Sequence, residues 1–197
     1  MNGDALALLE QQIRNCTLCG LYQTRNKAVA GGGNPDGKIL LIGEAPGYEE
    51  DKTGKVFVGK SGQLLDKILS ACNFSREKEV YISNVVKCRP PGNRTPSPQE
   101  QKSCLPYLVK QMEIIKPAII VTLGATPLKA LFGNEMRITK QRGQWLYWKN
   151  GIPVMPTYHP SALLRNPALK HQTWEDFKKI IIKYRELVDA GHYCQYI

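Results

Sequence analysis

No stretch of about 18 uninterrupted apolar residues occurs in the chain, so the sequence does not predict a membrane-spanning helix. The longest apolar runs lie within residues 38–42 and 118–121 and have only the length of strands. Residues 1–6 also lack the basic segment and following apolar segment of a secretory signal. We therefore expect no contact with a membrane and a reducing, cytoplasmic compartment, in which cysteines rarely form disulfides.

Sequence repeats, low-complexity segments and interdomain linkers are also absent. The 197 residues are 42% hydrophobic and 22% charged, which is the balance of a folded globular protein. A chain of this length can bury roughly 70% of the surface that it exposes when unfolded, so a core can form without disulfides or a partner. We predict a single domain over residues 1–197 and a monomeric protein.

Acidic residues are in the minority, because 17 Asp and Glu oppose 27 Lys and Arg, which gives a net charge of +10 and a pI near 9.3. Since the chain has no basic tail, we expect this positive charge on the folded surface. Such a surface attracts polyanions, of which nucleic acid is the commonest inside a cell. Charge alone is equally consistent with a protein that is merely basic.

Apolar, strand-like runs alternate with segments of helical periodicity. We expect strands at residues 38–42, 80–86, 118–123 and 152–155, and helices at residues 5–14, 61–72, 97–116, from 126 onward and 174–187. Ser61 can cap the second helix, Ser97 and Glu100 form a capping box before the third, and Asn150-Gly151 predicts a β-hairpin. The alternation predicts an α/β protein, a three-layer α/β/α sandwich with a central four-stranded parallel sheet and the small hairpin before its last core strand.

In an open parallel sheet, ligands bind outside the carboxyl ends of the strands. Here those ends lead into residues 43–60, 84–98, 124–126 and 157–167. The first of these segments begins with Gly-Glu-Ala-Pro-Gly, which lets the backbone turn tightly and leaves amide groups free for a ligand. An ordinary acidic turn is the alternative, because neither a P-loop nor a dinucleotide-binding motif is present.

Three side chains that can hold a flat ligand fall in these segments. Phe57 can stack on a planar ring or anchor its loop in the core. Asn84 offers one acceptor and two donors to a base edge, although asparagine at a strand end more often caps a turn. His159 precedes Leu163 and Leu164, an apolar tip of the kind that a DNA-wedging protein needs, whereas a lone histidine is more often structural.

The six cysteines call for an explanation other than disulfides. Cys16 and Cys19 form a Cys-x-x-Cys motif, and Cys88 and Cys104 follow near expected element boundaries, while Cys72 fits the apolar face of a helix. Four thiolates near one point would bind zinc or an iron–sulfur cluster and tie the N-terminal helix to the sheet. Two unrelated buried pairs are the alternative, and spacing alone does not choose between the metals.

In combination these motifs resemble the family 4 uracil-DNA glycosylases, the iron–sulfur branch of the uracil-DNA glycosylase superfamily. The resemblance runs from about residue 16 to residue 165 and is carried by residues 43–47, 57–59, 83–90, 119–124 and 159–165, with four cysteines in the family's order. It implies a monofunctional glycosylase that hydrolyses uracil from single- or double-stranded DNA, leaves an abasic site and initiates base excision repair. It also implies a structural [4Fe–4S] cluster on Cys16, Cys19, Cys88 and Cys104.

The resemblance further implies that the protein flips the uracil out of the duplex before it acts on it. Leu163, with Leu164 nearby, is expected to fill the space that the base leaves. Ser161 and Arg165 are expected to contact DNA, the arginine through phosphates. Phe57 is expected to stack on the uracil ring.

Base recognition and bond cleavage are expected from the remaining motif residues. Asn84 would donate to uracil O4 and accept from N3–H, a pattern that cytosine inverts. His159 would donate to O2 and stabilise the leaving uracil anion. Gly43 and Ala45 would line the base pocket, where Glu50 would help to exclude the methyl group of thymine.

The residue that positions the attacking water is a separate question, because the superfamily's first branch has an aspartate where this chain has Ala45. Glu44 is our first candidate to replace it. Glu50 is the second candidate and Asn93 the third.

Two rival functions compete with this interpretation. A non-catalytic, DNA-binding iron–sulfur or zinc protein explains the cysteines and the charge, but not why Phe57, Asn84 and His159 all fall at the ligand edge. A uracil-binding relative that becomes covalently trapped on abasic DNA carries an inserted basic loop with a nucleophilic histidine. The corresponding segment here, residues 58–61, is too short for that insertion.

Overall fold

A six-stranded sheet forms the centre of the computed structural model, which describes residues 2–197. Its strands are β1 (Gly32–Gly33), β2 (Ile39–Gly43), β3 (Val80–Asn84), β4 (Ile119–Leu123), β5 (Leu146–Trp148) and β6 (Ile152–Thr157). They lie in the order β1-β3-β2-β4-β6-β5. The four central strands are parallel, and β1 and β5 pair antiparallel at the edges. The predicted four parallel strands are therefore present, and one short strand extends the sheet at each edge.

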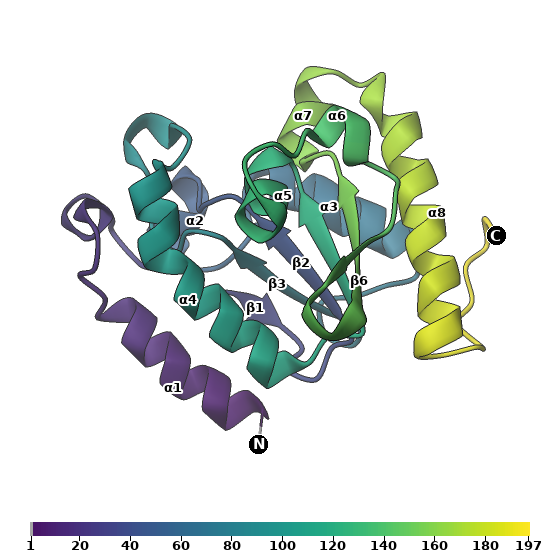
Figure 1. Cartoon of the computed structure of the whole chain (residues 1–197), viewed down its shortest axis with the longest axis horizontal. Helices are drawn as coiled ribbons and strands as arrows, with labels where there is room; N and C mark the ends of the chain where they lie inside the picture. The colour runs from purple at the N-terminus through teal and green to yellow at the C-terminus, as the bar shows by residue number, and fades with distance from the viewer. Residues whose placement is uncertain (1) are drawn as a thin grey trace.

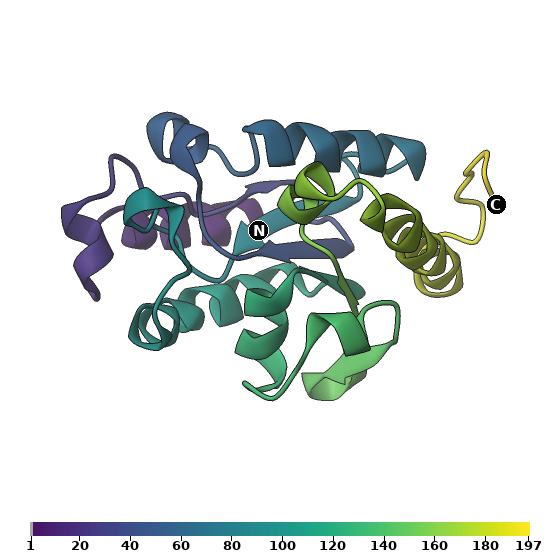
Figure 2. The ribbon, with the colours of Figure 1, turned by 90° about the horizontal axis from the view of Figure 1, so that it is seen from above.

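Helices cover both faces of this sheet, as Figures 1 and 2 show. They are α1 (Asn2–Arg14), α2 (Tyr48–Thr53), α3 (Lys60–Ala71), α4 (Pro98–Ile115), α5 (Ala125–Phe132), α6 (Ile138–Gln141), α7 (Pro160–Arg165) and α8 (Leu169–Leu187). Alternate residues of β2 face opposite layers: Ile39 and Leu41 pack in the core with α3 and α8, whereas Leu40 and Ile42 pack in the core with α1 and α4. The predicted three-layer α/β/α sandwich is confirmed.

Two of the predicted local signals operate as expected. The Ser97 hydroxyl accepts the backbone N–H of Glu100 at 3.3 Å, and the Glu100 carboxylate accepts the backbone N–H of Ser97 at 2.7 Å, so the capping box starts α4. Between β5 and β6, Asn150 and Gly151 have φ values of 59° and 79°, the left-handed conformation that these residue types tolerate in a tight turn.

The start of α3 differs from the sequence prediction. The helix begins at Lys60 and its N-cap is Gly59, not Ser61. The cause is a tertiary contact, because the Glu50 carboxylate accepts the backbone N–H groups of Val58 and Gly59 at 2.8 and 2.9 Å. Val58 and Gly59 are thereby fixed directly before Lys60, and Gly59 has the extended backbone of an N-cap, so the helix starts earlier than its own sequence signal indicates.

The segments at residues 43–60 and 157–167 were expected to be loops, but each holds a short helix. They are α2 and α7, each of six residues. A helix of this length spans less than two turns and shows no apolar periodicity in the sequence. Both helices lie directly after the ends of central strands, β2 and β6, and so bring their first residues to the carboxyl edge of the sheet.

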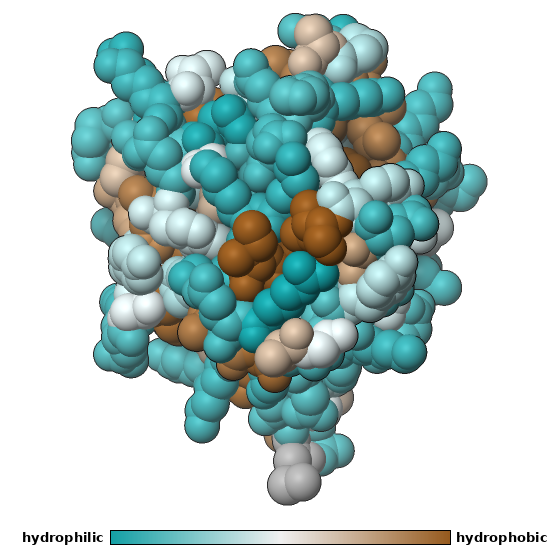
Figure 3. Space-filling view, turned by 90° about the vertical axis from the view of Figure 1, so that its right-hand side faces the viewer, coloured by the Kyte–Doolittle hydropathy of each residue, from teal (hydrophilic) through white to brown (hydrophobic). Residues whose placement is uncertain are grey.

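The outer surface is largely hydrophilic on the face that Figure 3 shows, where hydrophobic residues, the most hydrophobic of them near the centre of the view, lie among hydrophilic ones. None of the described helices is long and apolar enough to cross a membrane. The chain ends on this side of the molecule, beyond α8, as Figure 1 shows.

We predict that Ser97→Ala lowers the free energy of unfolding by about 1 kcal/mol, because it removes the side-chain acceptor at the start of α4. Urea unfolding followed by circular dichroism measures the change. Ser70→Ala is the matched control, since Ser70 is an exposed serine near the end of α3. An equal effect of the two substitutions would contradict the assignment of the cap.

Candidate active site

A cavity of about 600 Å³ opens at the carboxyl edge of the sheet, beyond the ends of β2, β3, β4 and β6. The predicted site residues that line it are Glu44, Ala45, Glu50, Phe57, Asn84, His159, Ser161 and Arg165. The structure thus brings an aromatic ring, an amide and an imidazole together from three separate segments of the chain. Phe57, Asn84 and His159, which the sequence placed at the expected ligand edge, therefore share one cavity.

Gly43, the last residue of β2, is the point at which two of these side chains converge. It is paired with Asn84 in the register of β2 and β3. A Cβ atom on Gly43 would lie 2.8 Å from Cε2 of Phe57 and would also overlap the side-chain oxygen of Asn84. Only glycine therefore allows the ring and the amide to approach each other across the strand end.

Phe57 is held in an unusual backbone conformation, with φ of 50°. Such a conformation is costly for a residue other than glycine and persists only where its surroundings impose it. Arg76 is the main constraint, because its guanidinium donates to the carbonyls of Val56 at 2.8 Å and Phe57 at 2.7 Å. Sequence reasoning missed Arg76, which lies 19 residues from Phe57 and outside every motif.

Asn84 presents a buried polar atom that has no partner. The residue is 1% exposed, and its Oδ1 makes no hydrogen bond. Buried polar side-chain atoms in folded proteins are nearly always paired, so an unpaired oxygen on a residue that lines a cavity leaves an acceptor available to a ligand. The amide lines the same cavity as Phe57 and His159.

Lys87 fixes the backbone behind this amide, and sequence reasoning did not single it out. Its fully buried ammonium donates to the carbonyl of Asn84 at 2.7 Å, to Ser83 Oγ at 2.6 Å and to Gln111 Oε1 at 2.7 Å. Burial lowers the pKa of Lys87 to about 8, so the group is still mainly charged at neutral pH and uses all three of its protons.

His159 is the N-cap of α7, and its ring orientation follows from this position. Its Nδ1 accepts the backbone N–H of Ser161 at 3.1 Å. Because a backbone N–H can only donate, the neutral ring must carry its own proton on Nε2. The ring centroid lies 5.5 Å from that of Phe57, so the Nε2–H donor belongs to the same pocket as the phenyl ring.

The imidazole of His159 is neutral over the physiological range. Its pKa is lowered to about 4, mainly because burial disfavours the charged ring and also because Arg165 is nearby, while Glu50 acts in the opposite direction. The ring is consequently a neutral hydrogen-bond donor and not a cation at pH 7.

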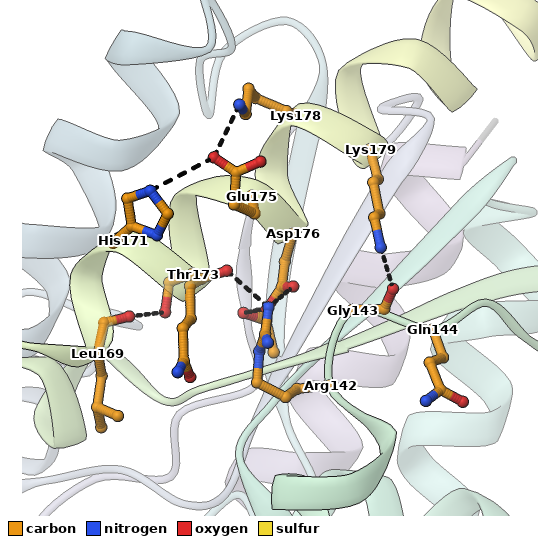
Figure 4. Close-up of polar contacts among 12 residues, drawn as sticks. Arg142, Gly143, Gln144, Leu169, His171, Thr173, Glu175, Asp176, Lys178 and Lys179 are labelled. Atoms are coloured by element: carbon orange, nitrogen blue, oxygen red, sulfur yellow. Dashed lines mark hydrogen bonds and ion pairs between the residues drawn. The ribbon is translucent and has the colours of Figure 1, made fainter.

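The end of β6, which directly precedes the segment with His159, is hydrogen-bonded to α8. The Thr157 hydroxyl donates to the buried carboxylate of Asp176 at 2.7 Å. Figure 4 shows Arg142 pointing to the same carboxylate, with which it forms an ion pair. Lys179 donates to the carbonyl of Gly143 at 2.6 Å, one helical turn further along α8. These contacts hold the end of β6 two residues before the imidazole.

The carboxylates of Glu50 and Glu44, the two candidates to position the attacking water, differ in the number of hydrogen bonds that they already accept. Glu50 accepts the backbone N–H of Gly47 at 3.1 Å with one oxygen and those of Val58 and Gly59 with the other. It therefore closes the loop that carries Phe57. Glu44 accepts one hydrogen bond, from the Thr126 hydroxyl across the cavity. Of the two, Glu44 has the greater remaining capacity to bind water.

The expectation that Leu163 projects from the surface is wrong. Leu163 is 1% exposed and packs inward from α7, whereas Leu164 is 46% exposed. Consecutive residues of a helix point in different directions, and the helix was not foreseen, so the sequence pattern alone could not tell which leucine faces outward. Leu164 and Arg165 are thus the solvent-facing pair at this rim.

The four cysteines that were expected to act together line one small cavity between α1, α4 and the segment after β3. Three of their sulfur atoms accept hydrogen bonds: Cys16 from the backbone of Leu18 at 3.5 Å, Cys88 from Arg25 at 3.0 Å and Cys104 from the backbone of Lys87 at 3.2 Å. Cys19 completes the lining. The alternative of two unrelated pairs does not fit this arrangement.

Within residues 2–197, no three Cys, His, Asp or Glu side chains stand close enough together to bind a single metal ion. An iron–sulfur cluster is wider than one zinc ion and holds its cysteine sulfurs farther apart. Four cysteines around one cavity, three of whose sulfurs accept N–H donors, form a donor set of the kind that binds an iron–sulfur cluster.

The fold and the cavity thus define an α/β protein with a cavity at the carboxyl edge of its sheet, lined by an aromatic ring, an amide and an imidazole. The family model described as Uracil DNA glycosylase superfamily matches residues 30–178. The Type-4 uracil-DNA glycosylase of Thermotoga maritima is 47% identical over 89% of this chain and 93% of its own length. That of Archaeoglobus fulgidus is 40% identical over 90% of this chain and 92% of its own length.

A Type-5 uracil-DNA glycosylase of Thermus thermophilus is more distant, with 28% identity over 82% of this chain and 80% of its own length. The chain belongs to the uracil-DNA glycosylase superfamily, and within it to the type-4 (family 4) branch. The resemblance inferred from the motifs is thereby confirmed.

We predict that acid weakens the folded state partly through His159. Between pH 6.5 and about 4 the unfolded chain protonates this residue while the folded chain does not, so stability is lost as the pH falls through that window. Urea unfolding at several pH values should show a steeper loss for the wild type than for His159→Gln. Parallel pH profiles for the two proteins would contradict the depressed pKa.

Proposed function

We propose that the protein hydrolyses the N-glycosidic bond between uracil and deoxyribose in DNA, which releases uracil, leaves an abasic site and initiates base excision repair. The observation that carries the proposal is the unpaired Oδ1 of Asn84, buried in a cavity whose other walls include Phe57 and His159. Membership of a family of uracil-DNA glycosylases supports it.

The target nucleotide has to leave the duplex to reach this cavity, because its floor is formed by buried strand ends. Unstacking and unpairing a base costs a few kcal/mol, which contacts with the flipped nucleotide must offset. The excess of positive charge attracts the DNA backbone. Ser161 and Arg165 at the rim would bind phosphates, and the exposed Leu164 would occupy the space in the base stack.

Uracil is recognised through its hydrogen-bonding edge. The Oδ1 of Asn84 would accept from N3–H, and the amide nitrogen would donate to O4. Cytosine offers an unprotonated ring nitrogen and an amino group in these positions, so both contacts would become repulsive. Phe57 would stack on the face of the ring, and the close packing across Gly43 fixes the angle between ring and amide.

Cleavage moves the bonding electron pair from the sugar carbon C1′ to the uracil ring, where the negative charge gathers on O2. The neutral His159 would donate its Nε2–H to that oxygen, in an environment where burial strengthens the interaction. Because the donor is fixed by Ser161 before the substrate arrives, little reorganisation is needed at the moment of reaction.

The sugar is left as an oxocarbenium ion, to which water adds at C1′. The water oxygen forms the new bond, and its released proton neutralises the uracil anion, so the products are uracil and a hydroxyl at C1′. Glu44 would orient this water and offset the positive charge of the sugar, since Ala45 offers no carboxylate. Glu50 would act on the pocket only by shaping the Phe57 loop.

Cys16, Cys19, Cys88 and Cys104 would hold a [4Fe–4S] cluster. When bound, the cluster would supply a structural clip between the N-terminal segment and α4 and would take no part in the hydrolysis. The hydrogen bonds to three of the four sulfurs are the observation that supports this assignment.

The protein is further proposed to act on DNA as a monomer. One chain supplies the aromatic ring, the amide and the imidazole of the cavity, which supports this proposal.

The decisive experiment incubates the purified protein with a single-stranded and a duplex oligonucleotide, each containing one uracil, and then treats the DNA with alkali. Release of free uracil with alkali-dependent strand scission supports the enzyme. A DNA adduct that does not dissociate would instead support a covalently trapped uracil binder. Binding with neither reaction would support a non-catalytic DNA-binding protein.

We predict that His159→Ala lowers the rate of uracil release by about 10²–10³-fold, because it removes the donor to the developing charge on O2. Affinity for the uracil oligonucleotide, measured by fluorescence anisotropy, should change little. Equal losses in turnover and in binding would argue against a role in stabilising the leaving group.

We also predict that Cys104→Ser abolishes the brown colour and lowers the iron content of the purified protein. Cys72→Ser is the matched control, because Cys72 is buried in another part of the fold. Absorption spectra and iron analysis measure the result. Retention of full iron by the Cys104 variant, or zinc in a colourless wild type, would overturn the cluster assignment.

A further inference from the structure

An exposed aromatic ring stands at the rim of the cavity and plays no part in the mechanism described above. Tyr48, the first residue of α2, is 54% exposed, and it directly follows Gly47, which lines the cavity. The guanidinium of Arg89 lies over the ring, 5.2 Å from its centroid. One ring face is therefore covered by a cation, while the residue as a whole stays open to solvent.

Arg89 is itself held in place by a residue of its own segment that lines the cavity. Its Nε donates to Oδ1 of Asn93 at 2.7 Å, and Asn93 lines the cavity. The backbone of Asn93 has φ of 55°, which fixes the turn that presents this oxygen. The tyrosine and the arginine thus connect the segment after β2 with the segment after β3, and both segments border the uracil pocket.

An exposed tyrosine alone would carry no inference, because surface aromatic residues are common. Here the ring is already oriented by Arg89, so little side-chain freedom remains to be lost when a ligand stacks on it. The arginine adds positive charge directly beside the ring. A flat group attached to a negatively charged backbone matches both features, and that is the chemistry of a nucleotide in a DNA strand.

We propose that Tyr48 and Arg89 form a second base-binding platform, which takes the unpaired nucleotide next to the uracil on the same strand. The inference rests on the proposed function, because that function places a DNA strand across the cavity rim. The neighbouring base stacks on the open part of the Tyr48 ring, and Arg89 contacts the phosphate between the two nucleotides. In a duplex the neighbouring base is already stacked and paired, so the platform favours single-stranded DNA.

The test combines a substitution of Tyr48 in the protein with removal of a single base from the DNA. The substrates are a single-stranded oligonucleotide with adenine on both sides of the uracil, and two versions in which tetrahydrofuran replaces the 5′ or the 3′ adenine. Dissociation constants come from fluorescence anisotropy and rates from uracil release. Tyr48→Ala removes the ring, and Tyr48→Phe is the matched control that keeps it.

Tyr48→Ala is expected to weaken binding of the intact oligonucleotide by about fivefold or more, the low end of the loss for one base stacked on an aromatic ring. The rate at saturation should be unchanged, and Tyr48→Phe should bind like the wild type. On one of the two tetrahydrofuran substrates the difference between wild type and Tyr48→Ala should vanish, since the base that stacks is missing there. The effect should be smaller on duplex DNA.

Unchanged affinity of Tyr48→Ala for the intact oligonucleotide would overturn the platform, as would a loss that persists equally on both tetrahydrofuran substrates. Thermal melting of each variant controls for folding. The two proposals fail separately: absence of uracil release by the wild type counts against the glycosylase, whereas the dissociation constants, measured in the His159→Ala background to suppress turnover, test the platform.

Discussion

The close approach of Phe57 and Asn84 across the end of β2 is the constraint on which the whole site depends. It is possible because Gly43 and Asn84 are paired in adjacent parallel strands and Gly43 has no side chain. The ring and the amide then form two walls of one narrow space. Arg76 holds the strained backbone of Phe57, and Glu50 closes the loop that carries it, so several distant residues impose a geometry that the loop would not adopt alone.

Several polar groups of the same site are buried away from water. Lys87 is a buried cation whose three protons are all used, His159 is kept neutral by burial, and Asn84 retains an unpaired oxygen. Each arrangement costs stability in the free protein, because buried polar groups lose their hydration. Under the proposed function the gain would be electrostatic preorganisation, because the donors and acceptors for a pyrimidine would be in place before it arrives. Burial of apolar side chains in the core between the sheet and helices α1 and α4 offsets part of this cost.

Much of the fold was predictable because its signals are local. The alternation of buried apolar runs with helical periodicity predicted the four parallel strands and the layers on either side. The capping box at Ser97 and the Asn150-Gly151 turn act through neighbouring backbone atoms, so the sequence contains the whole interaction. The short helices α2 and α7 were missed because six residues cannot display a period. The start of α3 was missed because it depends on Glu50, a residue outside that helix.

The sequence by itself determined the class of fold, the sheet edge at which the cavity opens and the kinds of side chain available there, because hydrophobic periodicity and motif order are properties of the chain alone. Only the tertiary structure decided which leucine of α7 faces outward, which carboxylate is already engaged and why His159 stays neutral. These properties depend on distance and burial. Both arise when segments far apart in the sequence pack together, and neither leaves a signal in the order of the residues.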